Sequence, residues 1–376
     1  MKTDILKKGY GTIRDLASHL KTSNIILFES INDFDGSSLE VYNYLKNNGY
    51  DKKYRLIWSV KNPESLNNDN YNSIGYLAKS FKNIYYENKA KYVFFEDILP
   101  VARRKPEQTV VYLSHACPVL KNCRGKIIVG DKCDYAICTN DAVEDFISYQ
   151  FTVEKEKLFI CGLPRNDVLF RKHNELEKIS NEKFDKVIFW LPTFRKIADR
   201  IDSEKNYYLD IPTIENKQQL NKLNSFAKEL NTLIIIKFHP RAQISTDDIE
   251  NYSNIIILTD KDKKALGIET YPLLTQTDAL ISDYSSIAFD YLLLDKPIGF
   301  ITEDMKDYNI GFAFDDVENY MPGSKINSFD DLCTFISNVA TNKDDYKSER
   351  KRVSDWANKY RDSENAKRVV ERFIEK

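Results

Sequence analysis

The sequence predicts an α/β protein with two Rossmann-like domains. Its 376 residues are enough for two domains of ordinary size. Short apolar runs alternate with amphipathic stretches along the chain, a pattern typical of βαβ units and parallel sheets. Residues 171–185 are polar and charged, without a strand signal, and divide the alternation into two series. We therefore expect two domains that face each other across a cleft and are joined by this linker.

The first series predicts an N-terminal domain over residues 1–170. A helix is expected over residues 37–48, directly after the first strand. The strands expected from the apolar runs cover residues 24–29, 54–60, 91–96, 109–113, 134–138 and 158–161.

The second series predicts a C-terminal domain over residues 186–344. Its expected strands cover residues 186–191, 233–238, 254–258, 279–281 and 297–301. The tail beyond them is charged but carries apolar positions at helical spacing, which predicts a pair of helices. We expect these helices, residues 345–376, to join the first domain.

Composition excludes several classes of protein. The 55 Lys and Arg residues balance 57 Asp and Glu residues, whereas a general nucleic-acid binder has a clear basic excess. The six cysteines form no CxxC pair and fit no zinc template, so neither a metal nor another cofactor is expected. The chain shows no signal-peptide core, and no apolar run reaches the roughly 20 residues that span a bilayer. We therefore expect a cytoplasmic protein.

Polar residues follow five of the predicted strands at the point where each strand ends. Ligands of doubly wound sheets bind outside these carboxyl ends. The five stretches cover residues 114–118, 162–167, 192–195, 237–241 and 282–286. Their His, Arg, Lys and hydroxyl side chains suit phosphate chemistry.

Ser285 and Ser286 carry the strongest of these signals, because they open a helix directly after an apolar strand. The first backbone N–H groups of a helix have no intrahelical partner, so this turn predicts an anion site. The alternative is that both serines only cap the helix.

Four cations and two histidines complete the predicted site. Arg and Lys side chains can neutralise a diphosphate, and histidine exchanges a proton near neutral pH. These residues are Arg165, Arg195, Lys237, Arg241, His115 and His239. A structural histidine, or Thr193 as a helix cap with Arg195 on the surface, is the alternative interpretation. P-loop, dinucleotide and GxSxG motifs are absent.

Four motifs resemble those of the CDP-glycerol glycerophosphotransferase family, which includes primases and polymerases of wall teichoic acid. Residues 281–297 match its Ser-Asp-Tyr-Ser-Ser motif with the later Asp and Lys-Pro. Residues 237–240, 192–195 and 162–167 match its Lys-Phe-His-Pro, Pro-Thr-Phe-Arg and Gly-x-Pro-Arg-Asn-Asp motifs. The resemblance covers about residues 25–335 and is most specific in the second domain.

The resemblance implies a GT-B-like fold and transfer of glycerol phosphate, or another polyol phosphate, from a CDP-activated donor with release of CMP. It implies that His115 is the general base and that His239 stabilises the donor diphosphate. It further implies that substrate is bound by Ala116, Cys117, Pro118, Val119, Arg165, Pro192, Thr193, Arg195, Lys237, Phe238, Arg241, Asp283, Ser285, Ser286 and Asp290.

One motif departs from the family pattern. Residues 114–121 read Ser-His-Ala-Cys-Pro-Val-Leu-Lys, where the family has Trp-His-Gly-Thr-Pro-x-Lys. Ala116 adds a methyl group where the family has glycine, so the change affects the expected acceptor pocket.

Family acceptors are lipid-linked saccharides or growing polymers, which implies peripheral contact with the inner face of the cell membrane. Residues 2–21 and 119–128 are the candidate membrane surfaces, although each is equally compatible with packing on its own domain. Two rival functions remain: a GT-B glycosyltransferase that uses a nucleotide sugar, and a non-catalytic nucleotide-binding relative. The sequence does not separate primase from polymerase or glycerol from ribitol.

Overall fold

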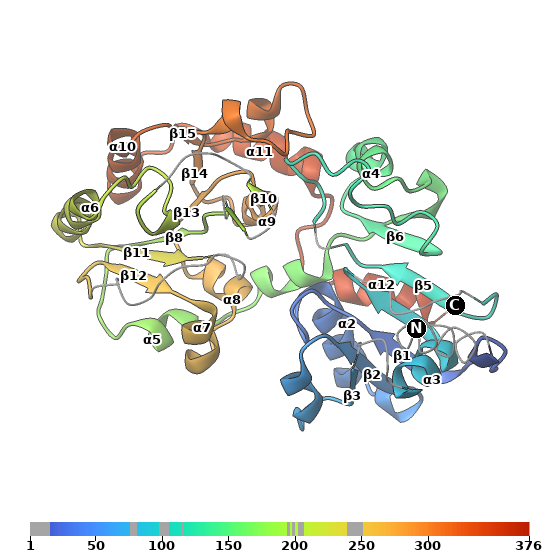
Figure 1. The fold of residues 1–376 in the computed structure, drawn as a ribbon. Helices are drawn as coiled ribbons and strands as arrows, with labels where there is room; N and C mark the ends of the chain where they lie inside the picture. The colour runs from blue at the N-terminus through green and yellow to red at the C-terminus, as the bar shows by residue number, and fades with distance from the viewer. Residues whose placement is uncertain are drawn as a thin grey trace, which may run out of the picture. The chain divides into compact units, whose positions relative to one another are not determined.

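The chain forms two compact α/β units (Figure 1). The computed structural model describes residues 16–75, 81–97, 105–114, 116–193, 196–197, 200–201, 207–238 and 251–375. The first unit comprises Met1–Cys117, Arg124–Asp167 and Lys359–Lys376, and the second comprises Pro118–Cys123 and Val168–Asn358. The predicted α/β fold class is confirmed.

The first unit contains a seven-stranded parallel sheet in the order β3-β2-β1-β4-β5-β6-β7. This order is the Rossmann order with one added strand. The strands are β1 (Ser23–Phe28), β2 (Arg55–Val60), β3 (Ser73–Gly75), β4 (Ala90–Phe95), β5 (Thr109–Tyr112), β6 (Tyr135–Cys138) and β7 (Leu158–Ile160). The six predicted strands are present. The unpredicted β3 has three residues, of which only Ile74 is apolar, and this is too little for an apolar signal.

The helices of this unit include α2 (Gly36–Asn47), α3 (Phe81–Lys89), α4 (Glu144–Phe151) and α12 (Asn365–Phe373). The predicted helix over residues 37–48 is α2, whose first N–H donates to the Asp35 side chain. Gly36 has a φ of +66°, and a Cβ there would overlap the Glu96 carboxyl group. The start of α2 therefore requires glycine.

The second unit contains a six-stranded parallel sheet in the order β12-β11-β8-β13-β14-β15. Its strands are β8 (Lys186–Trp190), β11 (Thr232–Lys237), β12 (Ile255–Leu258), β13 (Ala279–Ser282), β14 (Ile298–Ile301) and β15 (Ser324–Ile326), with a separate hairpin of β9 (Lys196–Ile197) and β10 (Arg200–Ile201). Numbered from β8, the order is 3-2-1-4-5-6, the Rossmann order. The five predicted strands are present, and short β15 was not predicted.

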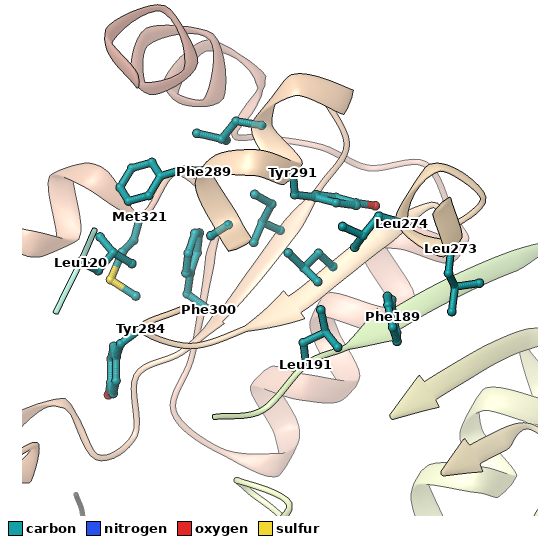
Figure 2. Packing of buried hydrophobic residues seen from close by; sticks show 14 of the residues in the cluster. Leu120, Phe189, Leu191, Leu273, Leu274, Tyr284, Phe289, Tyr291, Phe300 and Met321 are labelled. Carbon is teal, nitrogen blue, oxygen red and sulfur yellow. The ribbon is translucent and has the colours of Figure 1, made fainter. Parts of the chain in front are cut away.

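The helices of the second unit are α5 (Glu175–Ile179), α6 (Lys217–Glu229), α7 (Asp260–Leu266), α8 (Thr270–Thr275), α9 (Ile287–Tyr291), α10 (Phe329–Ala340) and α11 (Lys347–Ala357). Side chains alternate between the two faces of the sheet, so each face has its own apolar core. Phe189 and Ile235 belong to one core, which Figure 2 shows, and Trp190 and Ile236 belong to the other. Parallel strands buried on both faces leave the strand ends as the accessible part of the sheet.

Residues Pro118–Cys123 belong to the second unit, although residues on both sides of them belong to the first. Leu120 is buried in the core of Figure 2, and its carbonyl accepts from Ala313 N at 2.8 Å. Asn122 N donates to Gly311 O at 3.1 Å. The apolar residues Val119 and Leu120 are buried, so the membrane surface considered for residues 119–128 is wrong at these positions.

The other candidate membrane surface, residues 2–21, lies largely outside the described residues. Among the described residues, none of the helices is both long and apolar enough to cross a bilayer.

The predicted linker stretch, residues 171–185, contains α5 and clusters with the second unit. Glu175, at the start of α5, accepts from Lys178 Nζ at 2.8 Å and from Glu269 N at 3.0 Å. The stretch has no strand, but it is tied to the second unit by this carboxylate.

The two C-terminal helices divide between the units: α11 clusters with the second unit and α12 with the first. Helix α12 lies against α2 (Figure 1). Its N-terminus is held by Asp167, whose two carboxylate oxygens accept from Asn365 N and Ala366 N, each at 2.9 Å. The Asn365 side chain donates to Leu163 O at 3.1 Å, and a Cβ on Gly162 (φ +82°) would overlap that side chain. Residues of the Gly-x-Pro-Arg-Asn-Asp motif therefore fix the start of helix α12.

We predict that Asp167→Ala loosens α12 without unfolding the rest of the first unit. Loss of an N-terminal acceptor costs about 1–2 kcal/mol, which corresponds to roughly tenfold faster opening of the helix. Hydrogen exchange of peptides covering residues 365–373 measures the effect. Asp362→Ala, which removes a partly exposed partner of Arg368, is the control and should have a smaller effect. Equal exchange in the two variants would contradict the role of Asp167.

Candidate active site

The carboxyl ends of β11, β8 and β13 form one edge of the second sheet. These strands are neighbours, with β8 between the other two. The strand order reverses between β8 and β13, and such a switch point is where doubly wound sheets bind ligands. Thr193, Phe238 and Asp283 each follow one of these strands. The structure therefore brings three of the predicted motifs to one edge.

Asp283 connects the ends of β8 and β13. Its Oδ2 accepts from Thr193 N at 2.9 Å and from Thr193 Oγ1 at 2.7 Å. Asp283 is fully buried, and Thr193 and Pro192 are also buried. The predicted substrate contact at Asp283 is thus an internal acceptor that fixes the loop after β8.

Ser285 and Ser286 lie between β13 and α9 with half-buried side chains. Neither hydroxyl makes a hydrogen bond to any residue that the structure describes, and Ser286 does not cap α9 through its side chain. The capping alternative is therefore wrong. Helix α9 has only five residues before it tightens at Leu292–Leu294, so its dipole is small.

The turn is supported from inside the unit. The Tyr284 hydroxyl donates to Asp304 Oδ1 at 2.8 Å, and the Tyr284 ring packs on those of Tyr308 and Phe312. Asp290 accepts from the Tyr271 hydroxyl at 2.6 Å and is buried. One oxygen of Asp290, a predicted substrate-binding residue, is therefore already occupied by Tyr271.

Lys237 ends β11 with its ammonium group held by protein oxygens. Its Nζ lies 3.2 Å from Asp260 Oδ1 and donates to Phe238 O at 2.9 Å. Phe238 is buried in the second apolar core of the unit. Four further predicted site residues, His115, Arg195, His239 and Arg241, lie outside the described residues.

The first sheet presents two buried carboxyl groups that the sequence interpretation did not single out. Glu29 follows β1 and Glu96 follows β4, the neighbouring strands of the switch point in that sheet. Glu29 Oε1 lies 2.7 Å from Lys61 Nζ, and its Oε2 accepts from Glu96 N and Asp97 N. Glu96 Oε1 accepts from Ser38 N at 2.7 Å. A carboxylate placed directly after a buried apolar strand was the signal that could have identified both.

Burial raises the pKa of Glu96 to about 8, opposed by the hydrogen bond from Ser38 N and by the charge of Arg165. Arg165 is buried, and its backbone N–H donates to Ser37 Oγ at 3.4 Å. The structure therefore places the predicted Arg165 in the same electrostatic environment as a carboxyl group that holds a proton near neutral pH.

In the motif that departs from the family pattern, Ser114 and Ala116 are joined by hydrogen bonds. Ser114 has a φ of +48°, and its hydroxyl donates to Ala116 O at 2.7 Å. Cys117 Sγ lies 3.5 Å from Thr139 Oγ1. A hydrogen bond with Cys117, together with burial, raises the pKa of Cys138, so Cys138 is a neutral thiol. Ala116 and Cys117 are buried in the first unit, whereas Pro118 and Val119 are buried in the second.

Comparisons with known proteins agree in pointing to one family. The family model described as CDP-Glycerol:Poly(glycerophosphate) glycerophosphotransferase matches residues 13–375. Teichoic acid ribitol-phosphate polymerase TarL of Staphylococcus aureus is 25% identical over 94% of this chain and 62% of its own length. A teichoic acid poly(glycerol phosphate) polymerase of Bacillus spizizenii is 27% identical over 86% of each chain.

A solved structure shares the fold. The wall teichoic acid polymerase TagF superposes with a TM-score of 0.76 at 21% identity, over 99% of this chain and 95% of that one. The predicted GT-B-like fold is confirmed.

We predict energetic coupling between Thr193 and Asp283. Thr193→Val removes one of the two hydrogen bonds to Asp283, and Asp283→Asn places an N–H group where an acceptor was. In a double-mutant cycle of unfolding free energies, the double variant should lose about 1–2 kcal/mol less than the sum of the single variants. Thr302→Val combined with Asp283→Asn is the control cycle, because Thr302 bonds to Asn327 instead. Additivity in both cycles would contradict the coupling.

We predict that Glu96 makes the protein less stable as pH rises. The folded state keeps the Glu96 proton up to a pKa of about 8, whereas an unfolded chain loses it near 4.5. The free energy of unfolding therefore falls as pH rises between these values. Glu96→Gln removes this contribution, so its stability relative to wild type should increase by a few kcal/mol from pH 5 to pH 8, since one pKa unit is about 1.4 kcal/mol. Thermal unfolding against pH measures the difference. Glu107→Gln, at an exposed residue, is the control. If the stability of Glu96→Gln varied with pH in the same way as that of wild type, the prediction would be refuted.

Proposed function

Because the chain belongs to the CDP-glycerol:poly(glycerophosphate) glycerophosphotransferase family, we propose that it transfers a polyol phosphate from a CDP-activated donor, with release of CMP. The donor is CDP-glycerol or its ribitol counterpart. The acceptor is a lipid-linked saccharide or a polyol phosphate polymer at the inner face of the cell membrane. The names of the relatives, which are polymerases of ribitol phosphate and of glycerol phosphate, support this range of substrates.

The observation that carries the proposal is the pair of unbonded hydroxyls at the switch point of the second sheet. Ser285 and Ser286 follow β13 there, and neither makes a hydrogen bond to any described residue. Hydroxyl groups can donate to the non-bridging oxygens of a diphosphate. The adjacent Thr193 loop, fixed by Asp283, gives this donor pocket a rigid wall.

The proposed reaction is one displacement at phosphorus. An acceptor hydroxyl attacks the phosphorus that bears the polyol, and the bond from this phosphorus to the bridging oxygen breaks. The hydroxyl proton passes to His115, and the bridging oxygen leaves as part of CMP. Negative charge develops on the leaving oxygen, so His239 and the cations Lys237, Arg195 and Arg241 accelerate the step by stabilising it.

The first unit is assigned to the acceptor. In the sequence, His115 follows Ser114 and precedes Ala116, and these two neighbours are joined by hydrogen bonds. Glu96, protonated near neutral pH, can donate a hydrogen bond to an oxygen of the acceptor substrate. Arg165 can attract a phosphate group of the same substrate. Cys117 stands at the position of the family threonine, and its thiol lies 3.5 Å from the Thr139 hydroxyl, so this position is less polar than in the family pattern.

We predict that the full chain releases CMP from CDP-glycerol or CDP-ribitol when a lipid-linked saccharide or a polyol phosphate oligomer is added. His115→Ala should lower kcat by 10²-fold or more and leave donor affinity nearly unchanged, because a general base contributes about that factor. His239→Ala should lower both kcat and donor affinity. Release of CMP is followed by chromatography, and donor binding by calorimetry.

The matched control is His173→Ala, because the ring of His173 contacts Val168 O and takes no part in the proposed step. It should retain wild-type turnover. Absence of turnover with both donors and both acceptor types, or preferential binding of a UDP- or GDP-sugar, would overturn the proposed function.

A further inference from the structure

A pocket of about 570 Å³ lies in the first unit, and none of the residues assigned to catalysis lines it. It is formed at the amino ends of β1 and β2, between the last turn of α2 and the residues that precede β3. Its charged residues are Lys46, Lys52, Lys53, Arg55, Asp51 and Asp69. We propose that this pocket binds a segment of the polyol phosphate polymer, as a holding site distinct from the transfer site. This inference rests on the proposed function.

The charge of the pocket favours an anionic ligand. Its four cations outnumber its two carboxylates, and among the residues that the structure describes none of the four forms an ion pair. Lys46 and Lys53 lie over the rings of Tyr42 and Tyr54, at 5.8 and 5.2 Å from the ring centres. Arg55 lies 5.0 Å from the ring of Tyr86. These ring contacts hold the cations without neutralising them.

The remaining polar groups favour hydroxyls next to the phosphates. Asp51 and Asp69 supply acceptors, and the side chains of three asparagines, Asn24, Asn70 and Asn72, supply both donors and acceptors. Hydroxyl groups and phosphate groups alternate along a polyol phosphate polymer, and such a surface binds both. A uniformly anionic bilayer surface would gain from the cations but would be repelled by Asp51 and Asp69. The mixture therefore favours the polymer over a membrane.

The position of the pocket defines its role. Strands of a parallel sheet share one direction, so their amino and carboxyl ends lie at opposite edges. Strand β1 has six residues and separates the pocket from Glu29 by roughly 20 Å, at about 3.3 Å per residue. A bound segment would thus be several repeats away from the reacting end. Holding it raises the local concentration of that end at the transfer site, which favours long acceptors over short ones.

The test uses the full chain and a synthetic glycerol phosphate octamer, with glycerol 3-phosphate, inorganic phosphate and anionic phosphatidylglycerol vesicles as comparison ligands. Calorimetry and vesicle co-sedimentation measure binding in about 50 mM salt, because exposed charges are screened at higher ionic strength. The variant Lys46→Glu/Lys52→Glu reverses two exposed cations of the pocket. Lys82→Glu/Lys132→Glu makes the same charge change on exposed residues of the same unit outside the pocket.

We expect Lys46→Glu/Lys52→Glu to weaken octamer binding at least tenfold and to raise the KM for a long acceptor, with kcat and the KM for a short acceptor unchanged. The Lys82→Glu/Lys132→Glu control should bind as wild type does. Asn70→Ala is the second variant, which keeps the charge, and it should weaken the octamer but not inorganic phosphate.

Three outcomes overturn the inference: unchanged octamer binding in the pocket variant, equal affinity for octamer and phosphate, or loss of vesicle binding without loss of octamer binding. Each leaves CMP release intact. Failure of the proposed function is distinguishable, because wild type would then release no CMP with acceptors of either length.

Discussion

Burial of both faces of a parallel sheet is the constraint on which the rest of the structure depends. In the second unit, side chains of successive residues such as Phe189 and Trp190 enter different apolar cores, so no strand face remains for a ligand. Polar chemistry is confined to the strand ends. The Rossmann order then selects among these ends, because only at the reversal between β8 and β13 do the connections diverge and leave space.

Buried carboxylates organise these strand ends by accepting backbone N–H groups. Asp283 holds the loop after β8, Glu29 holds the backbone after β4, and Asp167 holds the first turn of α12. Each orients a chain segment that is distant in sequence. An ionised or strongly dipolar acceptor is well suited to this role, since a backbone N–H left unpaired inside a protein costs about 1–3 kcal/mol. Asp283, which was expected to bind substrate, is thus a residue that holds the Thr193 backbone in place.

The strands with three or more apolar residues were predictable, since burial on both faces requires apolar runs. The strands β3 and β15 were not, because Ile74 and Ile326 are their only apolar residues. The locations of Ser285 and Thr193 at strand ends followed from local sequence. The partner of Asp290 did not: Tyr271 lies 19 residues earlier, on another helix, and no local pattern indicates that pair. Glu29 and Glu96 were visible in the sequence but became significant only when the strand order placed them side by side.

The chain leaves and re-enters the first unit twice, at residues 118–123 and at residues 168–358. During synthesis on the ribosome, the partners of Asp167 therefore emerge only after residues 168–358 of the second unit. The first unit begins earlier than the second but is completed later. Until then its unpaired groups are exposed to chaperones and proteases, so a prematurely terminated chain is left without a completed first unit.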